Sequence, residues 1–106
     1  MAYSRNGEQD RALEDFHKVI EMNPKAEYAY NNRGYTFQIK GDLALAMADY
    51  NRAIEINPQL TLAYINRGNT FKAKGEQGNA CADWQRACDL GACAAYQQAQ
   101  KTHYCD

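Results

Sequence analysis

The sequence has little proline and no long apolar run. Only Pro24 and Pro58 are prolines among its 106 residues, and its uninterrupted apolar stretches are a few residues long. A helix that spans a bilayer needs roughly 20 consecutive apolar residues. We therefore expect no membrane insertion.

Neither sign of charge is in excess. The chain has 12 Lys and Arg against 13 Asp and Glu, which gives a formal net charge of −1 and a sequence pI of about 6.1. Surfaces that bind nucleic acid or anionic membranes normally carry a clear excess of basic residues. The charge balance argues against a nucleic-acid partner.

Alanine, by contrast, is abundant, and the β-branched residues are scattered singly instead of forming alternating runs. Both features favour helices over strands. The sequence therefore predicts an all-α fold.

The sequence also repeats itself with a period of 34 residues. The dipeptides Asn23-Pro24 and Asn57-Pro58 are separated by this offset. The same offset relates many further pairs, among them Tyr30 and Tyr64, Asn32 and Asn66, Arg33 and Arg67, Gly34 and Gly68, Phe37 and Phe71, and Gly41 and Gly75. So many coincidences at one offset identify an internal repeat.

Each repeat is predicted to form two helices. In the copy with the clearest pattern, a first helix (A) spans residues 26–40 and ends before Gly41. The second helix (B) is capped by Asp42 and runs to about residue 56. Asn57-Pro58 ends it, because proline cannot continue a helix and disfavours helical geometry in the residue before it.

Two small residues mark the place where the helices of a pair meet. Gly34 and Ala46 allow a close approach, and larger rings fill the space around it. This pattern resembles the tetratricopeptide repeat (TPR), and the residues that carry the resemblance are Tyr30, Gly34, Phe37, Ala46, Tyr50, Ala53 and Pro58. One departure recurs: the family usually has leucine immediately before the glycine of the first helix, whereas this sequence has Arg33 and Arg67.

The resemblance implies a right-handed superhelical array of antiparallel helix pairs with a C-terminal capping helix, in one domain over residues 1–106. We expect a truncated first repeat at 1–24, a second at 27–60, a third at 61–91 and the cap helix at 92–106. In the first repeat, only the end of an A helix, at about residues 1–5, precedes a complete B helix from Asp10 to Met22. Because this truncation leaves one helix face uncovered, self-assembly into dimers or filaments is an alternative function.

The resemblance further implies that the A helices line a concave groove, which binds an extended peptide or a partner's helix without catalysis and without a cofactor. The candidate contacts are the outward A-helix positions, Tyr28, Asn31, Asn32, Tyr35, Leu62, Ile65, Asn66 and Asn69. Some TPR superhelices carry an asparagine ladder at the position of Asn32 and Asn66, where each carboxamide can pair with a peptide backbone. Alternatively, these asparagines are merely solvated. A clamp of basic residues around a terminal carboxylate is not expected, because only Lys72 lies near the predicted groove.

The two arginines that replace leucine each have an acid sixteen residues later, on the partner helix. We expect Arg33 to pair with Asp49 and Arg67 with Asp83 inside each repeat. The planar guanidinium group matches a carboxylate with two parallel hydrogen bonds. These residues are therefore interpreted as structural pairs and not as ligand contacts.

Four cysteines lie in the last quarter of the chain: Cys81, Cys88, Cys93 and Cys105. A hairpin of the last B helix and the cap helix would bring Cys88 near Cys93 and Cys81 near Cys105. Three interpretations stay open: free buried thiols, one or two disulfides, which would indicate an oxidising compartment, and a zinc site with His103, for which the usual CxxC pair is missing. Neither His17 nor His103 has an evident acidic partner that would support a cysteine nucleophile. We expect neither an enzyme nor a bound metal.

Overall fold

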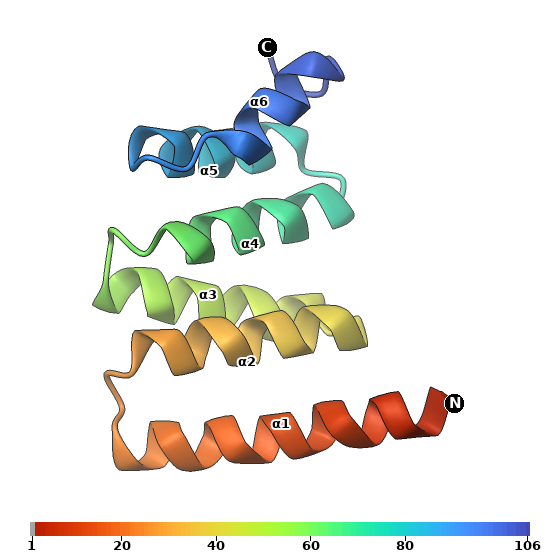
Figure 1. Ribbon diagram of the computed structural model, residues 1–106, viewed down its shortest axis with the longest axis vertical. Coiled ribbons are helices and arrows are strands. Elements are labelled where there is room, and N and C mark those ends of the chain that lie inside the picture. Colours follow the sequence, from red (N-terminus) through yellow and green to blue (C-terminus); the bar gives the residue numbers. More distant parts are fainter. Residues whose placement is uncertain (1) are drawn as a thin grey trace. The chain divides into compact units, whose positions relative to one another are not determined.

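The computed structural model describes the backbone of residues 2–106 and the side chains of residues 7–106. These residues form six helices and no strands (Figure 1), namely α1 (Ala2–Met22), α2 (Glu27–Lys40), α3 (Leu43–Ile56), α4 (Thr61–Ala73), α5 (Gln77–Asp89) and α6 (Ala94–Lys101). The all-α prediction is confirmed. The helices belong to two compact units, of which the first ends at Asn57 and the second spans Pro58–Asp106.

In the first unit, α2 packs against both α1 and α3 (Figure 1). The contact between α2 and α3 is centred on Gly34, and Ala46 and Tyr50 of α3 are completely buried there. A Cβ atom on Gly34 would lie 2.8 Å from Cε1 of Tyr50 and 3.1 Å from the carbonyl oxygen of Ala46. Residue 34 is therefore glycine because the ring of Tyr50 lies against its backbone and leaves no space for a Cβ atom.

The turn from α2 to α3 depends on a second glycine. Gly41 has φ of 88° and its N–H donates to the carbonyl of Gln38, while the N–H of Asp42 donates to the carbonyl of Phe37. These bonds satisfy carbonyls that the end of α2 would otherwise leave unpaired. Asp42 occupies the N-cap position of α3 but its side chain makes no capping hydrogen bond, so the predicted cap is wrong in this respect. The exposed carboxylate stays in solvent, and only the backbone of Asp42 takes part in the turn.

Helix α1 is continuous, whereas the sequence predicted a break between residues 5 and 10. Gly7 stands one repeat before Gly41 but lies inside the helix. Continuing the helix through Gly7 keeps the backbone groups on both sides of it paired. The side chains of residues 2–6 lie outside the described part of the chain, so nothing follows for their expected roles.

The second unit repeats the helix pair with a larger ring at its centre. A Cβ atom on Gly68 of α4 would lie 2.6 Å from Nε1 of Trp84 on α5. Helix α6 packs against α5 and adds Ala99 to a core that also contains Ala80, Trp84 and Cys105. The predicted cap helix thus packs on the last B helix, α5 (Figure 1).

Two disulfides hold this end of the chain. Cys81 of α5 is bonded to Cys105 in the segment after α6, with 5.7 Å between the Cα atoms, and Cys88 is bonded to Cys93 between α5 and α6. Of the three interpretations of the cysteines, the structure confirms the disulfides, with the pairing that the hairpin geometry predicted. The described residues contain no free cysteine, and no three His, Cys, Asp or Glu side chains gather there as metal ligands would.

The disulfides should contribute unequally to stability. Constraint of the unfolded chain grows with the length of the closed loop, and the sequence separations are 24 for Cys81–Cys105 and 5 for Cys88–Cys93. Urea denaturation should show a loss of about 3.5 kcal/mol in the free energy of unfolding for Cys81→Ser with Cys105→Ser, and about 2 kcal/mol for Cys88→Ser with Cys93→Ser. Four reactive thiols in the denatured, unreduced parent would contradict both bonds, and two would contradict one of them.

Candidate functional site

Helix α2 exposes a stripe of large side chains. Tyr28, Tyr35 and Ile39 are 57, 48 and 51% exposed. At about 100° per residue, they lie within about 40° of one another around the helix axis, and the exposed Asn32 lies at the edge of the same stripe. Exposed apolar side chains that gather on one face are typical of an interaction surface, whereas isolated ones are not.

The structure removes one residue from the predicted contacts. Asn31 is 2% exposed, so the expectation that it faces outward is wrong. It lies about 60° from Gly34 around the helix axis. This small angle between Asn31 and the close-contact glycine is the signal in the sequence that could have indicated its burial.

In the second unit, α4 presents the equivalent positions with different exposure. Leu62 is 52% exposed and Asn69 is also exposed, whereas Ile65 and Asn66 are half-buried. The backbone around the two predicted ladder positions is the same: Thr36 Oγ1 donates to the carbonyl of Asn32, and Thr70 Oγ1 to that of Asn66, each at 3.0 Å. That both carboxamides contact one ligand stays a prediction.

The arginines that replace the family's leucine lie between helices. Arg33 donates from Nε and Nη2 to both carboxylate oxygens of Asp49, each at 2.7 Å, and Asp49 is 1% exposed. Arg67 and Asp83 repeat this geometry at 2.8 Å. The structure therefore places each arginine against the acid that the sequence assigned to it.

Arg33 has a second partner, which was not predicted from the sequence. Its Nη1 lies 2.9 Å from Nδ1 of His17 on α1, and because a guanidinium group only donates, this ring nitrogen is the acceptor. Arg33 thus links all three helices of the first unit. The signal in the sequence is the spacing, because His17 precedes Arg33 by the same sixteen residues that separate Arg33 from Asp49.

Comparison with known families decides the identity of the fold. Residues 27–60 match one tetratricopeptide repeat model and residues 1–26 match another, so that together the two matches cover more than half of the chain. The chain belongs to the tetratricopeptide repeat family. A comparison with curated proteins gives no match.

Solved structures agree with a TPR helical array. The first TPR of Spaghetti (RPAP3), bound to the HSP90 peptide SRMEEVD, superposes with a TM-score of 0.81 at 23% identity, over 98% of this chain and 86% of that one. YrrB, a TPR protein with an unusual peptide-binding site, gives 0.73 at 28% identity, over 74% of this chain and 41% of its own. MamA gives 0.74 at 24% identity, over 78% and 48%. This chain therefore spans less than half the length of the YrrB and MamA structures.

The arginine–aspartate pairs give this TPR chain charged contacts at a position where the family usually has leucine. The hydrogen bond to Asp49 raises the pKa of Arg33 above its ordinary value and outweighs the opposing effect of burial. Asp83 raises the pKa of Arg67 in the same way. Because the pKa of each arginine is raised, its contribution to stability is fully present below the ordinary arginine pKa and is lost as the pH rises through the raised value, in strongly alkaline solution.

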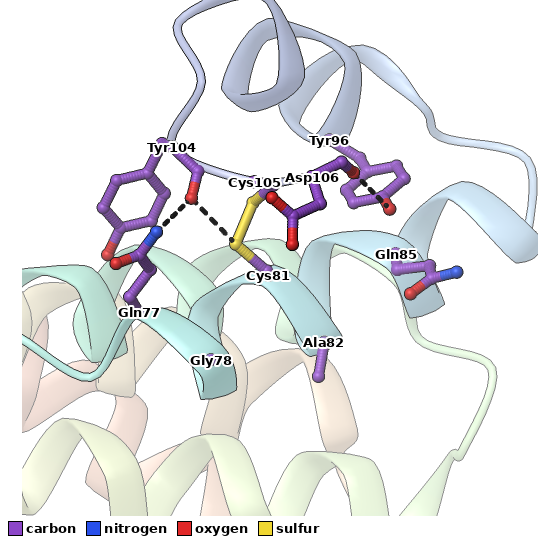
Figure 2. A pocket seen from close by; sticks show the side chains of 9 residues that line it. All are labelled: Gln77, Gly78, Cys81, Ala82, Gln85, Tyr96, Tyr104, Cys105 and Asp106. Atoms are coloured by element: carbon purple, nitrogen blue, oxygen red, sulfur yellow. Dashed lines mark hydrogen bonds between the residues drawn. A yellow bond between two sulfur atoms is a disulfide. The ribbon is translucent and has the colours of Figure 1, made fainter.

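A hollow of about 410 Å³ lies over α5, beside the Cys81–Cys105 bond (Figure 2). The disulfide stands between Tyr104 on one side and Asp106 on the other. Several polar groups around the hollow are already paired. Gln77 donates a hydrogen bond to the carbonyl of Tyr104, and the hydroxyl of Tyr96 donates one to the carbonyl of Asp106. The hollow beside the disulfide is therefore a weak candidate for a ligand site.

A second hollow, of about 440 Å³, lies in the first unit and is lined by Lys25, Tyr30, Arg52, Glu55 and Ile56. Its charges have both signs, and Arg52 also binds Asp49 at 2.8 Å. It has no evident preference for a charged ligand. In the described part of the TPR chain, none of the helices is long and apolar enough to cross a membrane.

The ion pair in the first TPR unit can be tested by removing its buried charge. Asp49→Asn should lower the free energy of unfolding by about 2 to 3 kcal/mol, because the substitution leaves the charged Arg33 without its carboxylate partner. Arg52→Ala is the matched control, since it removes the other, largely exposed partner of Asp49 and should cost less than about 1 kcal/mol. Urea titrations followed by circular dichroism measure both, and equal losses would contradict a special role for Arg33.

Proposed function

We propose that this TPR chain is a protein-interaction scaffold, which holds an extended peptide or a partner's helix on the outward faces of its A helices, α2 and α4. The observation that supports the proposal most is the exposed stripe of Tyr28, Tyr35 and Ile39 on α2. These large side chains stay in water although the same helix buries an asparagine and a threonine. A partner that covers the stripe would recover the free energy of burying apolar surface.

The comparisons support the same class of function. The RPAP3 TPR is described with a bound HSP90 peptide, and YrrB is described as having a peptide-binding site. Tetratricopeptide repeats are in general interaction scaffolds and not enzymes, so we propose no reaction for this chain.

In the proposed mechanism, apolar walls provide affinity and carboxamides hold the backbone of the ligand. Tyr28 and Tyr35 on α2, with Leu62 and Ile65 on α4, supply large contact surfaces, and Asn32 and Asn66 each offer a donor and an acceptor to a peptide group. Because a peptide backbone is the same in every sequence, the carboxamides would bind irrespective of the ligand's side chains. The ion pairs keep the A helices in register with their partners.

The carboxamide contacts can be tested with a synthetic library of random heptapeptides whose termini are acetylated and amidated. For the peptides that the parent binds most tightly, Asn32→Ala with Asn66→Ala should weaken binding by about 1 to 3 kcal/mol in isothermal titration calorimetry. Helicity should not change, because alanine is a better helix former than asparagine.

The matched control replaces two carboxamides outside the A helices, Asn79→Ala with Gln97→Ala, and should bind like the parent. If the Asn32 and Asn66 double variant also binds as tightly as the parent, the backbone-holding mechanism is wrong.

Self-assembly remains the alternative. Val19 and Met22 near the end of α1 are 45 and 87% exposed, which leaves apolar surface that a second copy could cover. Light scattering of the parent over a wide concentration range tests this function, since association should raise the apparent mass with concentration. A strict monomer at every concentration rejects it.

A further inference from the structure

A cavity of about 290 Å³ in the second unit lies among α4, α5, α6 and the segment that follows α6. It is lined by Asn69, Lys72, Trp84, Ala95, Gln98, Ala99, Thr102 and Tyr104. Two of these residues, Asn69 and Lys72, come from the A helix of the repeat, and the cap contributes most of the others. The cavity therefore borders the helix that the proposed function assigns to the ligand.

The inner wall of the cavity is apolar and firmly packed. Trp84 and Ala99 are 4 and 6% exposed and belong to the core of the unit. The ring of Tyr104 packs against that of Trp84, with 5.8 Å between the centroids. This wall can contact the methylene groups of a side chain without rearranging.

The rim of the cavity carries hydrogen-bond donors. Nζ of Lys72 lies 5.0 Å from the centroid of the Tyr104 ring, and Lys72 makes no ion pair within the described residues. The carboxamides of Asn69 and Gln98 make no hydrogen bond to any described residue. The hydroxyl of Thr102, by contrast, already donates to the carbonyl of Ala99.

No acidic residue lines the cavity. One full positive charge and two amide groups therefore face an apolar wall, with no carboxylate among the lining residues to neutralise them. A ligand group that matches this arrangement has a carboxylate at its end and a short apolar stem behind it.

Tyr104 holds this arrangement in place. The next residue, Cys105, is bonded covalently to Cys81 of α5, and Gln77 donates a hydrogen bond to the carbonyl of Tyr104. The aromatic ring in turn attracts the ammonium group of Lys72 over its face. The cation is thus kept at the mouth of the cavity by a segment that cannot move far from α5.

We propose that this cavity receives a glutamate side chain of the bound peptide, with Lys72 contacting the carboxylate and Asn69 and Gln98 offering further hydrogen bonds. The proposal rests on the proposed function, since it names the residue type that the same surface selects. Glutamate fits better than aspartate because its two methylene groups can lie on Trp84 and Ala99 while the carboxylate reaches the rim.

The heptapeptide library with blocked termini tests the proposal, because a side chain is then the only source of a carboxylate. Peptides that the parent retains should be enriched in glutamate. Replacing that glutamate by glutamine in a retained peptide should weaken binding to the parent about 3- to 10-fold, and less at high salt. Trp84 is the only tryptophan of the chain, so its fluorescence reports whether the cavity is filled.

Lys72→Gln should abolish the difference between the glutamate and glutamine peptides. Lys74→Gln removes the same charge two residues away, from a lysine that pairs with Glu76 and does not line the cavity, and it should keep the difference. Circular dichroism checks that both variants keep the helicity of the parent.

The outcomes separate this inference from the proposed function. If the parent retains no peptide, the proposed function fails. If it retains peptides without a preference for glutamate, or if Lys72→Gln keeps the preference, this inference fails while the proposed function stands. A preference for peptides with a free C-terminus, in place of glutamate, would show that the cavity holds a terminal carboxylate and would also overturn the inference.

Discussion

The close approach of the two helices in each repeat is the constraint on which the rest of the structure depends. At Gly34 and at Gly68 there is no space for a Cβ atom, because an aromatic ring from the partner helix lies directly against the backbone. This contact brings the neighbouring positions together as well. Arg33 precedes Gly34, and Asp49 precedes the ring of Tyr50, so the guanidinium and carboxylate groups meet once the backbones are close. The exposed stripe of α2 is the side of the helix that this contact leaves uncovered.

The 34-residue period was sufficient to predict the helix pairs, the glycine contacts and the partner of each arginine, because all of these are local to one repeat. The cysteine pairing also followed from the hairpin, although the sequence could not distinguish free thiols from disulfides. The geometry of a hairpin places two cysteines near each other in either state.

Other features could not be predicted because the repeat pattern does not determine them. Gly7 lies inside the continuous helix α1, although it is equivalent to Gly41 in the repeat, so the period alone does not determine where a turn forms. Asn31 was expected among the outward positions of the A helix, whereas it is buried about 60° from Gly34 around the helix axis. Most residues that line the cavity beside Lys72 belong to α6 and the segment after it, which lie outside the two-helix repeat pattern. Periodicity gives no information about such a segment.

The bond between Cys81 and Cys105 ties the last residues of the chain to the core of the second unit, where Tyr104 covers Trp84. A newly synthesised chain in which this bond has not formed would leave the tryptophan and its alanine neighbours accessible to water for more of the time. Exposed apolar surface of this kind is what chaperones and quality-control proteases recognise. Closing this one bond therefore shields the core of the second unit from water as well as strengthening its fold.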